Sequence, residues 1–232
     1  RSRLPAALPA CPPFTLAASC VSAREVGGDF HDVIAAGAGG LLLVIADVMG
    51  KGVPAALFAA MLRNAIRSMP HLFAHPGRLL ETVNQTLFAD LSRVDMFATA
   101  KVVFVDCGRR VLTAASAGHS LLLLASADCP PRVPDDAGLP LGIDPRATYG
   151  ESAIDLHPGD CALLYTDGVT EARDVNGALF GEHRLTDWFA ETVRTDQPVE
   201  AMKASLLDRL AAYCAGASAA DDQTFLLLRH SL

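Results

Sequence analysis

The sequence contains few aromatic residues and no long hydrophobic run. Phenylalanine, tyrosine and tryptophan make up 6% of the 232 residues, with a single tryptophan, so we expect a core built mainly of leucine, valine and alanine. The apolar runs at 41–46 and 121–125 have the length of strands and fall far short of the ~18 residues that a membrane span requires. These absences predict a soluble segment without membrane insertion.

Clusters of positive charge are also missing. The chain has 19 lysines and arginines against 26 aspartates and glutamates, a net charge of −7, and it contains no basic run. We therefore expect no nucleic-acid partner, because binding a phosphate backbone requires clustered cations. A surface this negative also disfavours a small polyanionic substrate, unless bound cations reverse the local sign of the potential.

Cysteine pairs at short spacing are absent as well. The six cysteines are scattered, at positions 11, 20, 107, 129, 161 and 214. This spacing matches neither a zinc knuckle nor a redox motif. We expect all six to be reduced and to pack as small hydrophobic side chains in a cytoplasmic protein.

The first 13 residues contain four prolines, and the chain begins with Arg1 rather than methionine. Such a start is too rich in proline for the apolar core of a signal peptide. We interpret residues 1–13 as a linker that follows an N-terminal sensor or receiver module in a longer protein. Residues 14–232 have the length of one domain.

The hydrophobic patterns predict strands followed by pairs of helices. Strands are expected at 14–21, 29–35, 41–48, 97–105, 111–117, 120–125, 151–156, 161–166 and 224–230. Helices are expected at 55–69, 76–91, 182–194 and 199–215, and the segment 129–149 has no clear periodicity. Because strands and helices do not alternate, this order predicts an α+β fold in which antiparallel sheet is layered with helices.

Four aspartates stand where short apolar runs meet turns. Asp47 and Asp167 close two predicted strands, Asp221 opens the last one, and Asp29 follows a pair of glycines. Carboxylates at the ends of neighbouring strands can converge into an all-oxygen site, which suits Mg²⁺ or Mn²⁺ better than zinc. Converging carboxylates repel one another, so such a cluster requires compensating cations.

Several short motifs occur in a fixed order along the chain. They are REVGGDFHD at 24–32, DVMGKGVPAAL at 47–57, AGH at 117–119, LPLG at 139–142, YTDGVTEA at 165–172, LFG at 179–181 and DDQT at 221–224. Together they resemble the PP2C-like (PPM) serine/threonine phosphatases, in particular the bacterial SpoIIE/RsbU branch. The resemblance covers almost the whole chain and identifies residues 14–232 as a phosphatase domain of this type.

The resemblance implies a four-layer αββα sandwich, in which two antiparallel sheets lie between pairs of helices and two Mn²⁺ or Mg²⁺ ions bind at one end. The family pattern assigns the metal ligands to Asp29, Asp47, Asp167, Asp221 and the backbone carbonyl of Val48. Asp47 bridges both ions in this pattern, and Asp29 acts directly or through water. Asp222 is the alternative to Asp221 within the paired aspartates.

The implied activity is hydrolysis of phosphoserine or phosphothreonine on a protein. Asp47 and Asp167 would be the essential catalytic residues, and a hydroxide bound by the two metal ions would attack phosphorus in line. The implied substrate is a STAS-type antagonist of an anti-sigma factor in a bacterial signalling pathway. A degenerate domain that binds a phosphoprotein as a regulatory module, and a phosphohydrolase of small phosphate esters, are the alternatives.

Two positions depart from the family pattern. His31 stands where this branch more often has tyrosine, and it could either shuttle a proton or serve as a hydrogen-bonded or surface histidine. Met49 stands where eukaryotic relatives have a histidine proposed to protonate the leaving group. The general acid is therefore unassigned.

The segment after Asp47 is interpreted as a site-shaping switch. Gly50 and Gly52 allow the backbone to turn tightly before the next helix begins. Lys51, between them, either contacts phosphate or is solvated.

Three more polar residues receive structural interpretations. Arg63 and Arg67 are four residues apart on one stripe of a predicted helix, which we interpret as a solvated face rather than a docking patch. His119 is expected to have a structural role in a hairpin corner.

Overall fold

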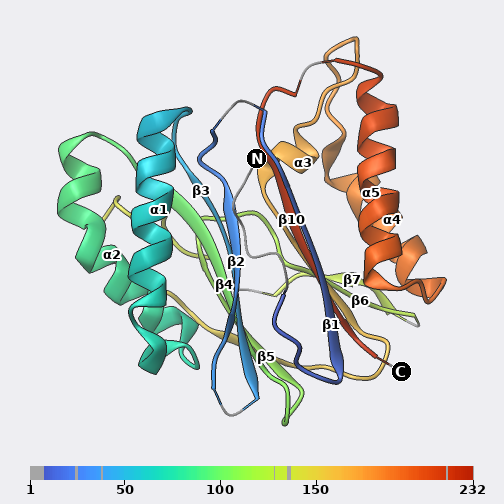
Figure 1. Cartoon of the computed structure of the whole chain (residues 1–232), viewed down its shortest axis with the longest axis horizontal. Coiled ribbons are helices and arrows are strands. Elements are labelled where there is room, and N and C mark those ends of the chain that lie inside the picture. The colour runs from blue at the N-terminus through green and yellow to red at the C-terminus, as the bar shows by residue number, and fades with distance from the viewer. Residues whose placement is uncertain are drawn as a thin grey trace.

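The structure is a computed structural model that describes residues 8–23, 26–37, 39–127, 129–134, 137–217 and 219–231. Two five-stranded sheets pack face to face, and helices cover their outer faces (Figure 1). Every strand pair with a recorded register in these residues is antiparallel. The predicted α+β sandwich of four layers is therefore confirmed.

The strands of the two sheets come from different parts of the chain. The first sheet has the order β2 (Phe30–Ala35), β3 (Gly40–Val48), β4 (Ala98–Asp106), β5 (Val111–Ala117) and β8 (Ser152–Asp155). The second has the order β1 (Phe14–Val21), β10 (Gln223–His230), β9 (Cys161–Tyr165), β6 (Leu123–Ser126) and β7 (Cys129–Arg132). The first and last strands of the chain are thus neighbours in one sheet.

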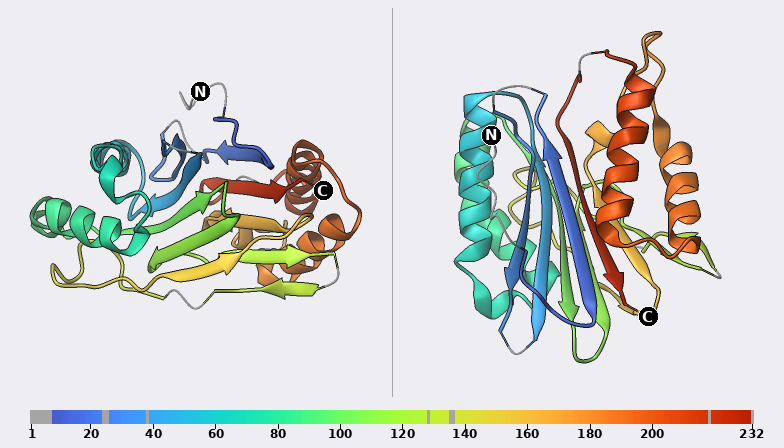
Figure 2. Two further views of the ribbon diagram at one scale, coloured as in Figure 1. Left: turned by 90° about the horizontal axis from the view of Figure 1, so that it is seen from below. Right: turned by 45° about the vertical axis from the view of Figure 1, so that its right-hand side comes forward.

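The helices form the two outer layers. They are α1 (Val53–Arg67) and α2 (Pro76–Arg93) on the first sheet, with the 3₁₀ turn η1 (Pro70–Leu72) between them, and α4 (Gly181–Arg194) and α5 (Val199–Cys214) on the second. A single turn, α3 (Asp167–Thr170), follows β9. Two further views show the helices outside the paired sheets (Figure 2).

Strand β3 shows how one alternating pattern contributes to two apolar layers. Leu42 and Val44 pack beneath α1 and α2, whereas Leu43 and Ile45 pack between the two sheets. The strand has β2 and β4 on either side, so both of its faces and both of its edges are covered. This position accounts for its continuous apolar run, and the predicted central strand is confirmed.

Three short elements, η1, β7 and α3, were not predicted, because none is long enough to show a period. Strand β7 has four residues and includes Pro130 and Pro131, which a strand tolerates at the edge of a sheet. Helix α3 also has four residues and begins at Asp167, where the sequence predicted only the end of a strand.

The prediction of six reduced, buried cysteines is wrong. Cys11 and Cys107 form a disulfide, and Cys129 is exposed. Cys11 precedes β1 and Cys107 lies in the turn between β4 and β5, so only the folded topology brings the two together. Within the described residues, no helix combines the length and apolar character needed to cross a membrane.

Removing this disulfide is expected to lower the free energy of unfolding by about 2–5 kcal/mol, because the bond closes a long loop in the unfolded chain. The two cysteines are separated by 96 residues. Urea unfolding of the Cys11→Ser variant, compared with the wild type with and without dithiothreitol, measures the effect. Cys214→Ser changes a free cysteine and is the matched control. An unchanged unfolding midpoint in Cys11→Ser would contradict this prediction.

Candidate active site

Five aspartates lie at one end of the sandwich, near the starts of α1 and α3. Both of these helices begin in the upper half of Figure 1. Asp29 precedes β2, and Asp47 is the next-to-last residue of β3, so the first sheet supplies both. The second sheet supplies Asp167, just after β9, and the pair Asp221 and Asp222, just before β10. Carboxylates from two separate sheets therefore face one another.

Glycines allow these segments to approach closely. A Cβ atom on Gly28 would lie 2.5 Å from the Val48 carbonyl oxygen and 3.4 Å from Oδ1 of Asp47. A Cβ on Gly168 would overlap the backbone carbonyl oxygen of Asp222. The glycines beside Asp29 and Asp167 are thus required by packing. Arg24 and Glu25, at the start of the first motif, lie outside the described residues.

The turn after β3 also requires glycine. Gly50 has φ 94° and Gly52 has φ 78°, a conformation that side chains with a Cβ disfavour. Lys51, between them, places its Nζ 2.8 Å from Oδ2 of Asp221 and 2.6 Å from the Ala220 carbonyl oxygen. Lys51 is exposed, and both contacts hold it against the turn before β10. This contact joins the start of α1 to the second sheet.

The carboxylates perturb one another strongly. Burial raises the pKa of Asp29, and the charge of Asp47 raises it further. Burial also raises the pKa of Asp47, followed by the charge of Asp167, and the pKa of Asp167 is raised by burial and by Asp221. Each carboxylate is thus coupled to the next, which identifies this end of the sandwich as one electrostatic unit.

Asp221 and Asp222 have different surroundings. Asp222 is 6% exposed, its Oδ1 accepts a hydrogen bond of 2.8 Å from the Ala23 backbone, and its carboxylate packs against Gly27. The side chain of Asp221 is 46% exposed and contacts Lys51. Asp221 is therefore the more available oxygen donor, and Asp222 fastens the loop before β2.

The available donors suit a hard cation. Carboxylate oxygens and the carbonyl of Val48 are the ligand types that Mg²⁺ and Mn²⁺ prefer. In the described part of the chain, no three side chains of His, Cys, Asp or Glu already stand together as a metal-binding group. The aspartates are electrostatic neighbours rather than a closed cage, so the assignment of ligands stays a prediction.

Neither histidine near the site is suited to general acid catalysis. His31 is only 6% exposed, so the surface alternative is wrong. Burial lowers its pKa to about 4, and its Nδ1 has no hydrogen-bond partner among the described residues. Burial and the charge of Lys101 lower the pKa of His119 to about 3, and its Nδ1 is 2.7 Å from the Thr99 hydroxyl. Both imidazoles are neutral at physiological pH. His119 has the structural surroundings that the sequence predicted.

Arg63 and Arg67 do not form the predicted solvated face. Both bind Asp32, which lies in β2 beneath α1 and is 1% exposed. Arg67 uses Nε and Nη2 at 2.5 and 2.7 Å, and Nε of Arg63 lies 2.9 Å from the same carboxylate. The prediction failed because two arginines at this helical spacing give the same sequence pattern whether they face water or a buried carboxylate.

Thr166 and Thr224 are polar neighbours of the site that the motifs did not single out. The Thr166 hydroxyl donates to Oδ2 of Asp29 at 2.7 Å, and the Thr224 backbone N–H donates to the Thr166 hydroxyl at 3.2 Å. Hydrogen bonds from both threonine side chains oppose the rise in the pKa of Asp29. The alternation along β9 and β10 could have pointed to these residues, since it places both between the sheets.

Replacing Asp29 with asparagine is expected to raise the stability of the protein in EDTA by several degrees, where ~1 kcal/mol corresponds to ~2–4 °C for a domain of this size. Burial and Asp47 raise the folded-state pKa of Asp29 above its ordinary value. Proton binding to this group thus stabilises the fold fully below about pH 4, and this contribution is lost as pH rises through the folded-state pKa. At higher pH the charged carboxylate opposes folding, and asparagine removes that charge.

Thermal unfolding at pH 5 and pH 8 measures this effect. The gain in melting temperature should be larger at pH 8. Asp187→Asn, on the exposed face of α4, is the matched control and should show no such gain. A lower melting temperature for Asp29→Asn at pH 8 would refute the electrostatic explanation.

Comparison with known proteins identifies the family of this chain. The SpoIIE family model, described as stage II sporulation protein E, matches residues 37–231. "Phosphoserine phosphatase RsbU" of Bacillus subtilis (strain 168) is 32% identical over 165 residues, which cover 71% of this chain and 49% of RsbU. The chain therefore spans about half the length of that relative.

Solved structures share the fold. The PP2C domain of SiaA from Pseudomonas aeruginosa has a TM-score of 0.80 at 28% identity, over 92% of this chain and 84% of that one. RsbX, determined in complex with magnesium, has a TM-score of 0.68 at 20% identity and covers 94% of each chain. These matches confirm the resemblance drawn from the motifs, and the chain belongs to the SpoIIE family.

Proposed function

We propose that this chain is a metal-dependent protein serine/threonine phosphatase domain, with the domain occupying residues 14–232. One observation carries the proposal: aspartates from two separate sheets lie at a single end of the sandwich, close enough to raise one another's pKa, with Asp29 and Asp47 half-buried. Membership of the SpoIIE family supports the same reading. Such a concentration of negative charge is suited to binding cations and unsuited to binding a phosphate directly.

We assign two Mn²⁺ or Mg²⁺ ions to these oxygen donors. Asp47 and Asp167 would be the essential ligands, and Asp29, Asp221 and the Val48 carbonyl would complete the set. When bound, the ions would lower the pKa of water and neutralise phosphate oxygens. Magnesium is bound by RsbX, which shares only the fold with this chain at 20% identity.

The protein itself would orient the donors and supply local charge. Gly28 lets the segment before β2 approach the end of β3, and Gly168 lets α3 approach the start of β10. Lys51 bridges the start of α1 and Asp221. A shift of α1 would therefore move both Asp47 and Lys51, so we propose that the segment Gly50–Gly52 couples α1 to the site. The general acid has no assigned residue, since both nearby histidines are neutral at physiological pH.

The proposed substrate is phosphoserine or phosphothreonine on a protein, with a STAS-type anti-sigma factor antagonist as the candidate. RsbU carries the name of a phosphoserine phosphatase, and the chain matches about half of it. An N-terminal sensor or receiver module and a cytoplasmic location complete the proposal. Residues 1–13 would lead to that module, and the disulfide of Cys11 would fasten this segment to the domain.

Hydrolysis of p-nitrophenyl phosphate and of a phosphoserine peptide tests the proposal. Activity on both that requires Mn²⁺ or Mg²⁺ and disappears in EDTA would support it. Activity on small esters alone would favour a metabolite phosphohydrolase. Calorimetric binding of a phosphopeptide without turnover, with no Mn²⁺ binding, would instead indicate a degenerate regulatory module.

A further inference from the structure

The site depends on how the two sheets are held relative to each other. Asp29 and Asp47 belong to the first sheet, and Asp167 and Asp221 belong to the second. Among the described residues, no ladder of backbone hydrogen bonds joins the two sheets. The spacing between the two sets of carboxylates must therefore be fixed by side chains that cross from one sheet to the other.

Thr166 makes such a crossing directly beside the site. It follows β9 in the second sheet, immediately before Asp167, and its hydroxyl donates to Oδ2 of Asp29 beside the first sheet at 2.7 Å. Thr166 is also completely buried. A short hydrogen bond to a carboxylate, shielded from water, is among the stronger polar contacts in proteins.

The single hydroxyl proton of Thr166 is committed to Asp29. A threonine hydroxyl has one proton to donate and two lone pairs to accept with. The Thr224 backbone N–H donates to this oxygen at 3.2 Å, and the other possible acceptor of its proton, the Thr224 carbonyl oxygen, is farther away at 3.4 Å. The Asp29 carboxylate at 2.7 Å is thus the better placed acceptor.

The side chain of Thr166 also does not cap the helix that it precedes. It is the N-cap residue of α3, where a threonine side chain ordinarily accepts a hydrogen bond from the helix backbone. In the structure, this side chain makes no capping hydrogen bond to α3 and is turned toward Asp29. A purely structural threonine at this position would cap its own helix.

We propose that Thr166 is a positioning residue that holds the Asp29 carboxylate in register with Asp167, so that the two sheets present one cation site. This inference rests on the proposed metal-dependent function and names a residue that acts through Asp29. It predicts that cation binding depends on the hydroxyl of Thr166 more than on the shape of the side chain.

Calorimetric titration with Mn²⁺ alone tests the inference. Thr166→Val removes the hydroxyl and keeps the shape, and we expect the Kd for Mn²⁺ to rise ~10–100-fold, as for outer-shell partners of metal ligands. Thr166→Ser keeps the hydroxyl and should restore a Kd close to that of the wild type. If the valine variant fails to fold, Thr166→Ala provides the same comparison without the added methyl group.

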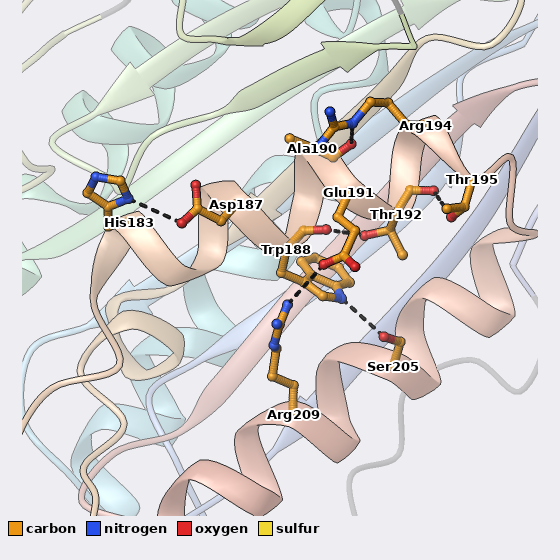
Figure 3. Close-up of polar contacts among 10 residues, drawn as sticks. All are labelled: His183, Asp187, Trp188, Ala190, Glu191, Thr192, Arg194, Thr195, Ser205 and Arg209. Atoms are coloured by element: carbon orange, nitrogen blue, oxygen red, sulfur yellow. Dashed lines mark hydrogen bonds and ion pairs between the residues drawn. The ribbon is translucent and has the colours of Figure 1, made fainter.

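Thr192→Val is the matched control. Thr192 is a buried threonine in α4, on the outer layer of the second sheet, and its hydroxyl donates to the Trp188 carbonyl oxygen (Figure 3). The same chemical change there should lower the melting temperature without altering the Kd for Mn²⁺. This comparison separates a general loss of stability from a specific loss of positioning.

The possible outcomes are distinct. A weakened Kd in Thr166→Val, rescued by serine and absent from Thr192→Val, would support the inference. Wild-type affinity in a folded Thr166→Val or Thr166→Ala variant would overturn it and leave the proposed function intact. Absence of Mn²⁺ binding by the wild-type protein would overturn the proposed metal site and this inference with it.

Discussion

Replacing Asp167 with asparagine is expected to reduce the Mn²⁺-dependent hydrolysis of p-nitrophenyl phosphate more than the ~10–100-fold that loss of an outer-shell partner costs. Asparagine keeps the size of the side chain and removes the charge that would hold a cation. Asp47→Asn should have an effect at least as large, because Asp47 lies between Asp29 and Asp167 in the chain of coupled carboxylates. Initial rates at fixed and at saturating Mn²⁺ measure the loss.

Two comparisons make this prediction specific. Asp187→Asn, which removes an exposed carboxylate on α4, should leave the rate unchanged. For the same loss of melting temperature, Asp221→Asn should lower the rate more strongly than Asp222→Asn. The reason is that Asp222 fastens the loop at Ala23. Retention of most activity in Asp167→Asn would contradict the proposed site.

Removing both arginines that bind Asp32 is expected to destabilise the fold by about 3–5 kcal/mol, the cost of leaving a buried charge without its partner. Asp32 is 1% exposed, so its carboxylate cannot reach water when Arg63→Met and Arg67→Met are combined. Asp32→Asn should cost less, because each arginine is more than one-third exposed and can turn toward solvent. Urea unfolding measures both free energies.

A surface pair provides the control. Arg93 and Asp90 form an ion pair on α2 with side chains 75% and 41% exposed, and Arg93→Met should cost no more than ~1 kcal/mol. Adding Asp32→Leu to the two arginine replacements should recover much of the loss, because an apolar substitute removes the uncompensated charge. Equal losses for Arg93→Met and for the double arginine variant would exclude a buried ion pair.

The elements with strong periodicity could be predicted from the sequence. The continuous apolar run of β3 and the helices α2 and α4 were placed within a few residues of their observed ends. Glycine-containing motifs also identified the turns beside Asp47 and Asp167, because close packing and positive φ demand that residue. These features depend on local chemistry, which a single sequence records.

Features that depend on two distant segments could not be predicted. The Cys11–Cys107 disulfide and the contact between Arg67 and Asp32 join residues whose proximity exists only after the sheets form. Thr166 was missed for the same reason, since its partner Asp29 lies in the other sheet. The predicted metal ligands also span both sheets, and here the family motifs supplied what spacing alone could not.

The position of β10 has a consequence for the order in which this domain forms during its synthesis. This last strand lies between β1 and β9, and the aspartates just before it face those of the first sheet. The second sheet therefore remains split between β1 and β9, and Asp221 unplaced, until β10 has been synthesised and has left the ribosome. A nascent chain can complete the helices and the first sheet earlier, since their contacts are nearer in sequence. The end of the domain that carries the carboxylates is thus among its last parts to form, because Asp221 and β10 follow the other helices and strands of the domain in sequence.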